Sequence, residues 1–172
     1  RNYWMVIHPP ILFLGFATTI VPFAYAYAGI QTKRFGDWVK PALPWALTSA
    51  CILGVGIMMG GKWAYESLSF GGYWAWDPVE NASLVPWMIL IAGLHTMVIY
   101  KATGHSLKAS YIFCFLTLAF ILYSTFLTKT GILGDSSVHS FTDPGMATNI
   151  MIGFFVSLFS ITPLIYFFIH SK

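Results

Sequence analysis

The sequence predicts an all-α membrane protein whose helices cross the bilayer about five times. Two observations carry this prediction. Of the 172 residues, 57% are hydrophobic and only 9% are charged, whereas an average globular domain has about 25% charged residues. The apolar residues also gather in runs near the length of about 20 residues that a membrane-spanning helix needs. A soluble domain of this composition would lack the polar residues to cover its surface, so a polytopic membrane protein remains.

Five apolar runs follow one another along the chain, and none of them contains Asp, Glu, Lys or Arg. They are residues 11–30, 41–60, 84–100, 109–127 and 147–169. The first comes directly after His8-Pro9-Pro10. We expect His8 to be held extended before the prolines, with the helix following at once. We treat residues 1–172 as a single membrane domain and, because the chain starts at Arg1 with no visible signal peptide, as a piece of a longer protein.

The links between the runs must lie alternately on the two sides of the membrane. One side receives 31–40, 101–108 and 170–172 with six Lys and Arg residues, and the other receives the N-terminal piece, 61–83 and 128–146 with three. The positive-inside rule then makes the first side cytoplasmic. We therefore predict a multi-pass protein of the inner (plasma) membrane, with 61–83 facing the periplasm or outer side. A net charge of +3 does not suggest a nucleic-acid partner.

The third helix has a recognisable start at Asp77-Pro78-Val79-Glu80. Asp77 suits the N-cap, Pro78 the first helical position, and Glu80 the third position of a capping box. The two carboxylates would then satisfy backbone amides that lipid could not satisfy. The alternative is a direct chemical role for the acids.

Tyr73, Trp74 and Trp76 stand close together in the external loop 61–83. Tyrosine and tryptophan collect at membrane interfaces, so a simple interfacial belt is one interpretation. The other is a platform on which a large, flat, apolar ligand stacks. The N-terminus of the third helix, directly after the aromatic cluster, would favour negative groups on such a ligand.

The five histidines divide by position. His105 and His170 fall in the basic inner links, where solvated interfacial roles are expected. His8 and His139 both fall on the outer side, in the segments flanking the aromatic loop. Imidazole is a normal axial ligand of haem iron, so this pair could hold a metallated macrocycle. Alternatively, both are interfacial histidines bonded to backbone or water.

His95 differs because it lies inside the third run, and an ionisable residue within a membrane is a functional hypothesis by default. It falls about eleven residues past Leu84, roughly 16 Å into a core about 30 Å thick. That depth predicts a ligand of a separate, intramembrane b-type haem, or a proton relay. The alternative is a neutral imidazole bonded to a neighbouring helix.

The run 71–81, GGYWAWDPVEN, resembles the tryptophan-rich "WWD" signature of the haem-handling proteins of cytochrome c biogenesis. That superfamily includes CcmC, CcmF and CcsA. Phe70 stands where a leading tryptophan is expected, which keeps the aromatic character. His8-Pro9-Pro10 resembles the first external haem-ligating histidine, and the stretch around His139 resembles the second. His95 resembles the intramembrane histidine of a b-type haem, which favours the CcmF-like branch.

The resemblance implies a haem lyase component that joins haem vinyl groups to the thiols of a C-x-x-C-H segment in apocytochrome c. It implies haem as cofactor, both external haem for transfer and b-type haem in the membrane. Its partners would be apocytochrome c, a haem chaperone, other cytochrome c maturation proteins and the lipid bilayer. The residues that it assigns to haem are His8 and His139 as external axial ligands, His95 for the b-type haem, Tyr73, Trp74 and Trp76 along the haem, and Asp77 to orient the loop.

Lys62 and Lys129 are candidates to meet the haem propionates, and no catalytic residue is assigned. Two other functions remain open. One is haem delivery or export without bond formation, as in the CcmC branch. The other is a transporter with an aromatic gate, which would need discontinuous helices around polar midplane residues.

Overall fold

The computed structural model describes residues 2–67, 72–134, 136–137 and 142–170. All of the regular structure in these residues is helical. The helices are α1 (Tyr3–Thr18), α2 (Ile20–Gln31), α3 (Val39–Ser67), α4 (Pro78–Thr103), α5 (Leu107–Lys129) and α6 (Met146–His170). Only Thr19 separates α1 from α2, and together they form one span, so the described residues contain five helical spans. The predicted fold class is confirmed.

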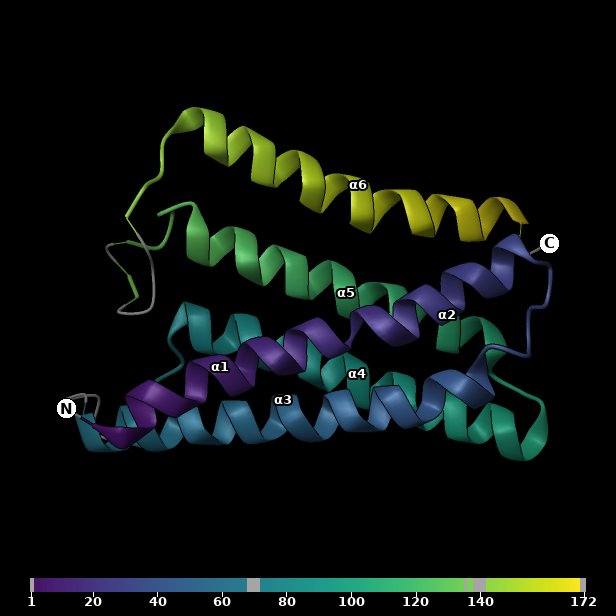
Figure 1. The fold of residues 1–172 in the computed structure, drawn as a ribbon, viewed down its shortest axis with the longest axis horizontal. Coiled ribbons are helices and arrows are strands. Elements are labelled where there is room, and N and C mark those ends of the chain that lie inside the picture. The colour runs from purple at the N-terminus through teal and green to yellow at the C-terminus, as the bar shows by residue number, and fades with distance from the viewer. Residues whose placement is uncertain (1, 68–71, 135, 138–141, 171–172) are drawn as a thin grey trace.

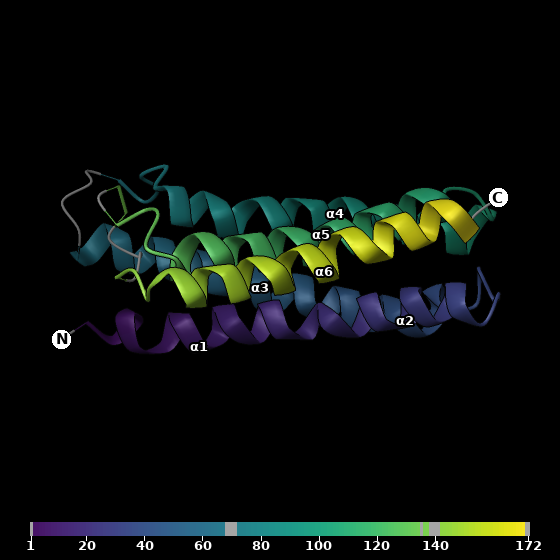
Figure 2. The same ribbon diagram turned by 90° about the horizontal axis from the view of Figure 1, so that it is seen from above.

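The spans run side by side with their ends gathered at two faces (Figures 1 and 2). The start of α1 and the links after α3 and α5 lie at one end, which we call the N-terminal end. The links after α2 and α4 and the end of α6 lie at the other. This alternation agrees with the predicted order of spans.

The first span begins earlier than the sequence predicted, and His8 is helical instead of extended. The side chain of Asn2 accepts from the amide of Trp4 at 2.8 Å and caps α1, which then runs through Pro9 and Pro10. Prolines remove helix hydrogen bonds. Packing on α3 compensates: a β-carbon on Gly15 would lie 2.7 Å from the Cα of Leu53, so the two helices touch backbone to backbone.

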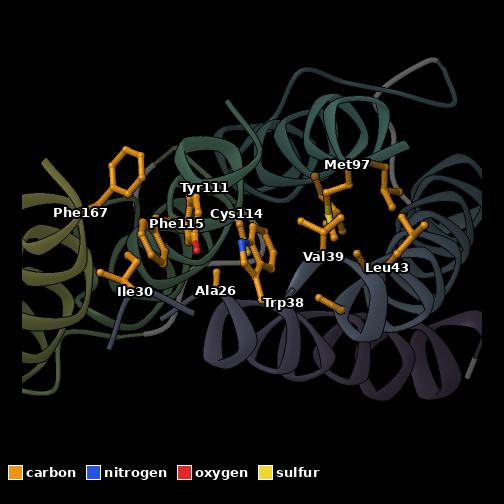
Figure 3. Packing of buried hydrophobic residues seen from close by; sticks show 14 of the residues in the cluster. Ala26, Ile30, Trp38, Val39, Leu43, Met97, Tyr111, Cys114, Phe115 and Phe167 are labelled. Carbon is orange, nitrogen blue, oxygen red and sulfur yellow. The ribbon is translucent and has the colours of Figure 1, made fainter. Parts of the chain in front are cut away.

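The main core lies toward the end of the bundle opposite the start of α1. Tyr111 and Phe115 of α5 lie between Trp38, the residue before α3, and Phe167 of α6 (Figure 3). The ring centroids of Trp38 and Tyr111 are 4.8 Å apart. The hydroxyl of Tyr111 also donates to the carbonyl of Phe35 at 3.0 Å. A smaller buried cluster of Phe16, Leu53 and Ile121 lies nearer the middle of the bundle, and cavities lie between it and the N-terminal end.

Candidate functional site

His8 projects from α1 into the interior of the N-terminal end and is buried. Its Nδ1 lies 2.9 Å from the carbonyl oxygen of Trp4, so Nδ1 carries the proton and donates it. Its ring stacks on Trp63 of α3, with centroids 5.4 Å apart and planes at 24°. In the neutral imidazole, Nε2 is therefore the nitrogen with a lone pair, which is the form that binds metals.

A cavity of about 340 Å³ lies beside His8 and is lined by residues of four helices, α1, α3, α4 and α5. Apolar side chains of α1 and the ring of Trp63 form one part of its wall. Ser124, Thr128 and Lys129 of α5 form another, and Ser83 of α4 lies between. The cavity is within the size range of about 300–1,000 Å³ that is usual for cofactor sites, and it is mostly apolar with few polar groups.

The three aromatic residues of the external loop are divided between two cavities. Trp74 lines a small cavity of about 50 Å³ together with His8, and it also lines a larger one of about 520 Å³. Tyr73 and Trp76 line only the larger cavity among these, on the side of α3 and α4 away from His8. Tyr73 is held there by stacking on Tyr65, with centroids 5.7 Å apart. Of the predicted aromatic platform, Trp74 thus lies at a cavity that His8 also lines, whereas Tyr73 and Trp76 do not.

The segment 72–77 folds back sharply before α4. Trp76 has φ +57°, a left-handed conformation that is uncommon for a bulky residue. Its carbonyl accepts from the side-chain amide of Asn81 at 3.0 Å, and its own ring lies edge-on to Trp74. The turn leaves Trp76 exposed while Trp74 is directed inward.

Asp77 and Glu80 begin α4 as predicted, with one difference. Oδ2 of Asp77 accepts from the amides of Val79 and Glu80 at 3.0 and 3.3 Å, and Pro78 is the first helical residue. Glu80 does not reach back to the amide of the cap as in a capping box. Its Oε2 accepts from the amide of Ala75 at 3.1 Å, because the turn at Trp76 brings that earlier amide within reach. Both acids are buried.

His139 and Phe70 lie outside the described residues. Two positions before His139, the hydroxyl of Ser137 donates to Oδ2 of Asp77 at 2.8 Å. The link between α5 and α6 is therefore bonded at Ser137 to the cap of α4, the helix whose Ser83 lines the cavity of His8. Residues 61–67 of the predicted external loop belong to α3, and 78–83 belong to α4.

His95 lies on the outer surface of the bundle, away from His8. Its Nδ1 lies 2.7 Å from the carbonyl oxygen of Ile91 in the same helix, not from a neighbouring helix. It is seventeen residues past Pro78, roughly 26 Å along α4. It is not among the residues that line the three cavities described above.

The two candidate lysines occupy different surroundings. Nζ of Lys62 lies 2.8 Å from Oε1 of Glu66 and 5.6 Å from the ring centroid of Tyr65. Lys129, at the end of α5, lines the cavity of His8. Trp63 also lines that cavity, and it is a site residue that the sequence did not single out. Neither its type nor its spacing distinguished it from a belt tryptophan.

The fold and this site define the class of protein: a multi-pass helical membrane protein with histidine-bearing, aromatic-lined cavities at one end of its bundle. Residues 1–133 match the family described as "Cytochrome C assembly protein", and the chain belongs to that family. The names of its relatives refer to cytochrome c biogenesis, and the chain is CcmF-like.

Three curated relatives illustrate the likeness. "Cytochrome c-type biogenesis protein CcmF" of Pseudomonas aeruginosa is 36% identical over 84% of this chain and 22% of its own length. "Cytochrome c-type biogenesis protein CycK" of Bradyrhizobium diazoefficiens is 37% identical over 84% and 22%. CcmF of Escherichia coli is 34% identical over 81% and 22%. The chain thus spans about a fifth of the length of these relatives. No solved structure matches it.

Proposed function

We propose that this chain holds haem at the outer face of the membrane for thioether attachment to apocytochrome c. The observation that carries the proposal is the state of His8: a buried imidazole with Nδ1 bonded to Trp4, at the wall of an apolar cavity of about 340 Å³. When bound, haem would supply the iron that takes imidazole nitrogens and the vinyl groups that react with thiols.

The residues around His8 fit a flat macrocycle. The bond from Nδ1 to the carbonyl of Trp4 fixes both the tautomer and the direction of Nε2, as second-layer bonds do for metal-binding histidines. Gly60 of α3 lies beside the imidazole, because a β-carbon there would lie 3.5 Å from Cδ2 of His8, in ordinary van der Waals contact. Stacking on Trp63 restrains the ring further. The chain thus orients the ligand nitrogen before any haem arrives.

We propose His139 as the second axial ligand. The support is its sequence position, two residues after Ser137, which is bonded to Asp77 at the N-terminus of α4. Asp77 would act through position, by holding the link between α5 and α6 and the aromatic segment against the same helix end. Of the two lysines, Lys129 is the better candidate for a propionate because it lines the cavity of His8.

Trp74 would meet haem at the inner edge of the site, and Tyr73 and Trp76 would present the aromatic surface of the larger cavity. Seven apolar or aromatic residues share that cavity with two glycines, which suits a flat apolar surface. A haem chaperone and other maturation proteins would be the partners at this face. It would be the periplasmic side of the inner membrane, as the distribution of Lys and Arg indicates.

His95 would bind a second, b-type haem within the membrane. It is exposed on α4, with Nδ1 bonded within its own helix, so Nε2 is directed away from its backbone as the ligand nitrogen. Its exposure requires that the remaining ligand come from elsewhere in a longer protein. Electrons from this haem could keep the external iron reduced.

The test is the absorption spectrum of full-length protein purified in detergent. Replacing both His8 and His139 by alanine should reduce or alter the spectrum of the external haem. His105→Ala, which changes an exposed histidine at the opposite end, is the matched control and should leave it unchanged. A double variant with the spectrum and cytochrome c maturation of the wild type would refute the site. If the wild-type protein loads haem normally but attaches none to apocytochrome c, haem delivery without bond formation would be favoured.

A further inference from the structure

Glu80 has one carboxylate oxygen with a partner and one without. The residue is 9% exposed, and its Oε2 accepts from the amide of Ala75 at 3.1 Å. Its Oε1 is fully buried and has no hydrogen-bond partner among the described residues. Because buried polar groups are almost always hydrogen-bonded, this atom requires an explanation.

Trp74 has a buried hydrogen-bond donor at the cavity that Glu80 also lines. Its Nε1 is buried, carries a proton that it can only donate, and has no acceptor among the residues that the structure describes. Trp74 and Glu80 both line the cavity of about 50 Å³ between α1, α3 and α4. Among the described residues, one donor and one acceptor without partners therefore belong to side chains that line the same small cavity.

The space is large enough and polar enough to hold an ordered water molecule. A water occupies about 30 Å³ of liquid volume and needs two to four polar partners when it is buried. We propose that the cavity binds an ordered water that accepts from Nε1 of Trp74 and donates to Oε1 of Glu80. Ser83 is a further candidate partner: its hydroxyl donates to the carbonyl of Glu80 at 2.8 Å and retains its capacity to accept.

This water makes Glu80 a positioning residue for the aromatic segment. Through Oε2 it holds the backbone at Ala75, and through the water it holds the indole of Trp74. The small cavity shares His8 with the cavity of about 340 Å³ and shares Trp74 with the cavity of about 520 Å³. Trp74 thus lines both the small cavity and the cavity of about 520 Å³, and Glu80 fixes it there whether or not a ligand is bound.

The direct test is a cryo-EM map of the full-length protein at a resolution that shows waters. Density within hydrogen-bonding distance of both Oε1 of Glu80 and Nε1 of Trp74 is expected. A map that shows both side chains clearly with nothing between them would overturn the proposal. Neither outcome depends on haem, so failure here is distinct from failure of the proposed function.

The second test measures hydrogen–deuterium exchange of residues 72–77 in the full-length protein. Glu80→Met should speed exchange roughly tenfold, since a bond to a charged group is lost and tenfold corresponds to about 1.4 kcal/mol. Glu80→Gln keeps an acceptor for Ala75 and a polar atom toward the water, so its exchange should stay close to wild type. Exchange in Glu80→Gln as fast as in Glu80→Met would contradict the hydrogen-bonding role.

Coupling between the two side chains distinguishes a shared water from two separate effects. Trp74→Phe should speed exchange several-fold, and adding it to Glu80→Met should give less than the product of the two effects. The control is Trp87→Phe, whose Nε1 bonds directly to the carbonyl of Ala50 at 2.9 Å. Its effect on the exchange rate should multiply with that of Glu80→Met in the double variant. If the effects of Trp74→Phe and Glu80→Met multiply as well, no shared water links the two side chains.

Discussion

The structure makes its clearest prediction for the effect of replacing Asp77. One oxygen, Oδ2, accepts from the amides of Val79 and Glu80 and from the hydroxyl of Ser137. Asparagine preserves an acceptor at that position and loses only the charge. Leucine has a similar size and no acceptor, so it leaves three donors unsatisfied at a buried position. Asp77→Leu should therefore be far more damaging than Asp77→Asn.

The magnitude follows from the groups involved. Losing a helix N-cap costs about 0.5–2 kcal/mol. Losing the acceptor of the partly buried hydroxyl of Ser137 costs about 1–1.5 kcal/mol more. We therefore expect about 3 kcal/mol for Asp77→Leu and about 1 kcal/mol or less for Asp77→Asn, as local opening free energies at the start of α4.

Hydrogen–deuterium exchange of the amides of Val79 and Glu80 measures this opening. Since 1.4 kcal/mol is a factor of about ten, Leu should speed exchange on the order of a hundredfold and Asn less than tenfold. Asp143→Leu is the control, because that exposed carboxylate also accepts two bonds, from Gly145 and Asn149, and water can replace it. Equal effects of Asn and Leu on exchange, with normal insertion, would refute capping, and equal loss of activity in the two variants would point to the charge itself acting on a ligand.

Three further predictions concern other parts of the chain. His95→Ala in the full-length protein should remove a b-type haem signal while external haem still loads; loss of the external signal alone would refute the assignment. Gly15→Ala should destabilise by about 1–3 kcal/mol in chemical unfolding, because its β-carbon would lie 2.7 Å from the backbone of α3. Gly153→Ala, with its nearest atom at 3.6 Å, should be neutral. Lys129→Ala should weaken haem retention in a titration more than Lys62→Ala, which removes a lysine paired with a glutamate.

The number and order of spans could be predicted from the sequence because each apolar run is long and uncharged. The start of the first span could not. Pro9 and Pro10 suggested a helix beginning after them, and local rules give no weight to the contact of α1 with α3. That tertiary contact keeps His8 helical and turns its ring toward Trp63.

The candidate site was only partly predictable for a similar reason. The cap at Asp77 and Pro78 depends on neighbouring residues, so its sequence was sufficient. Of the three aromatic residues, Trp74 alone lines the small cavity beside His8, and this placement depends on the left-handed turn at Trp76, which no turn residue marks. The partner of Glu80 depends on the same turn. Trp63 joins the site through the packing of two helices distant in sequence.

The packing of the spans has a consequence for the order of assembly. The closest pairings are α1 with α3 and α4 with α5, each within one hairpin of consecutive spans. The cavity of His8 takes its walls from both hairpins, so it does not exist while either is inserted alone. A ligand that binds there stabilises only the docked form, by mass action. Under the proposed function, haem would therefore find no complete site on a chain whose two hairpins have not yet paired.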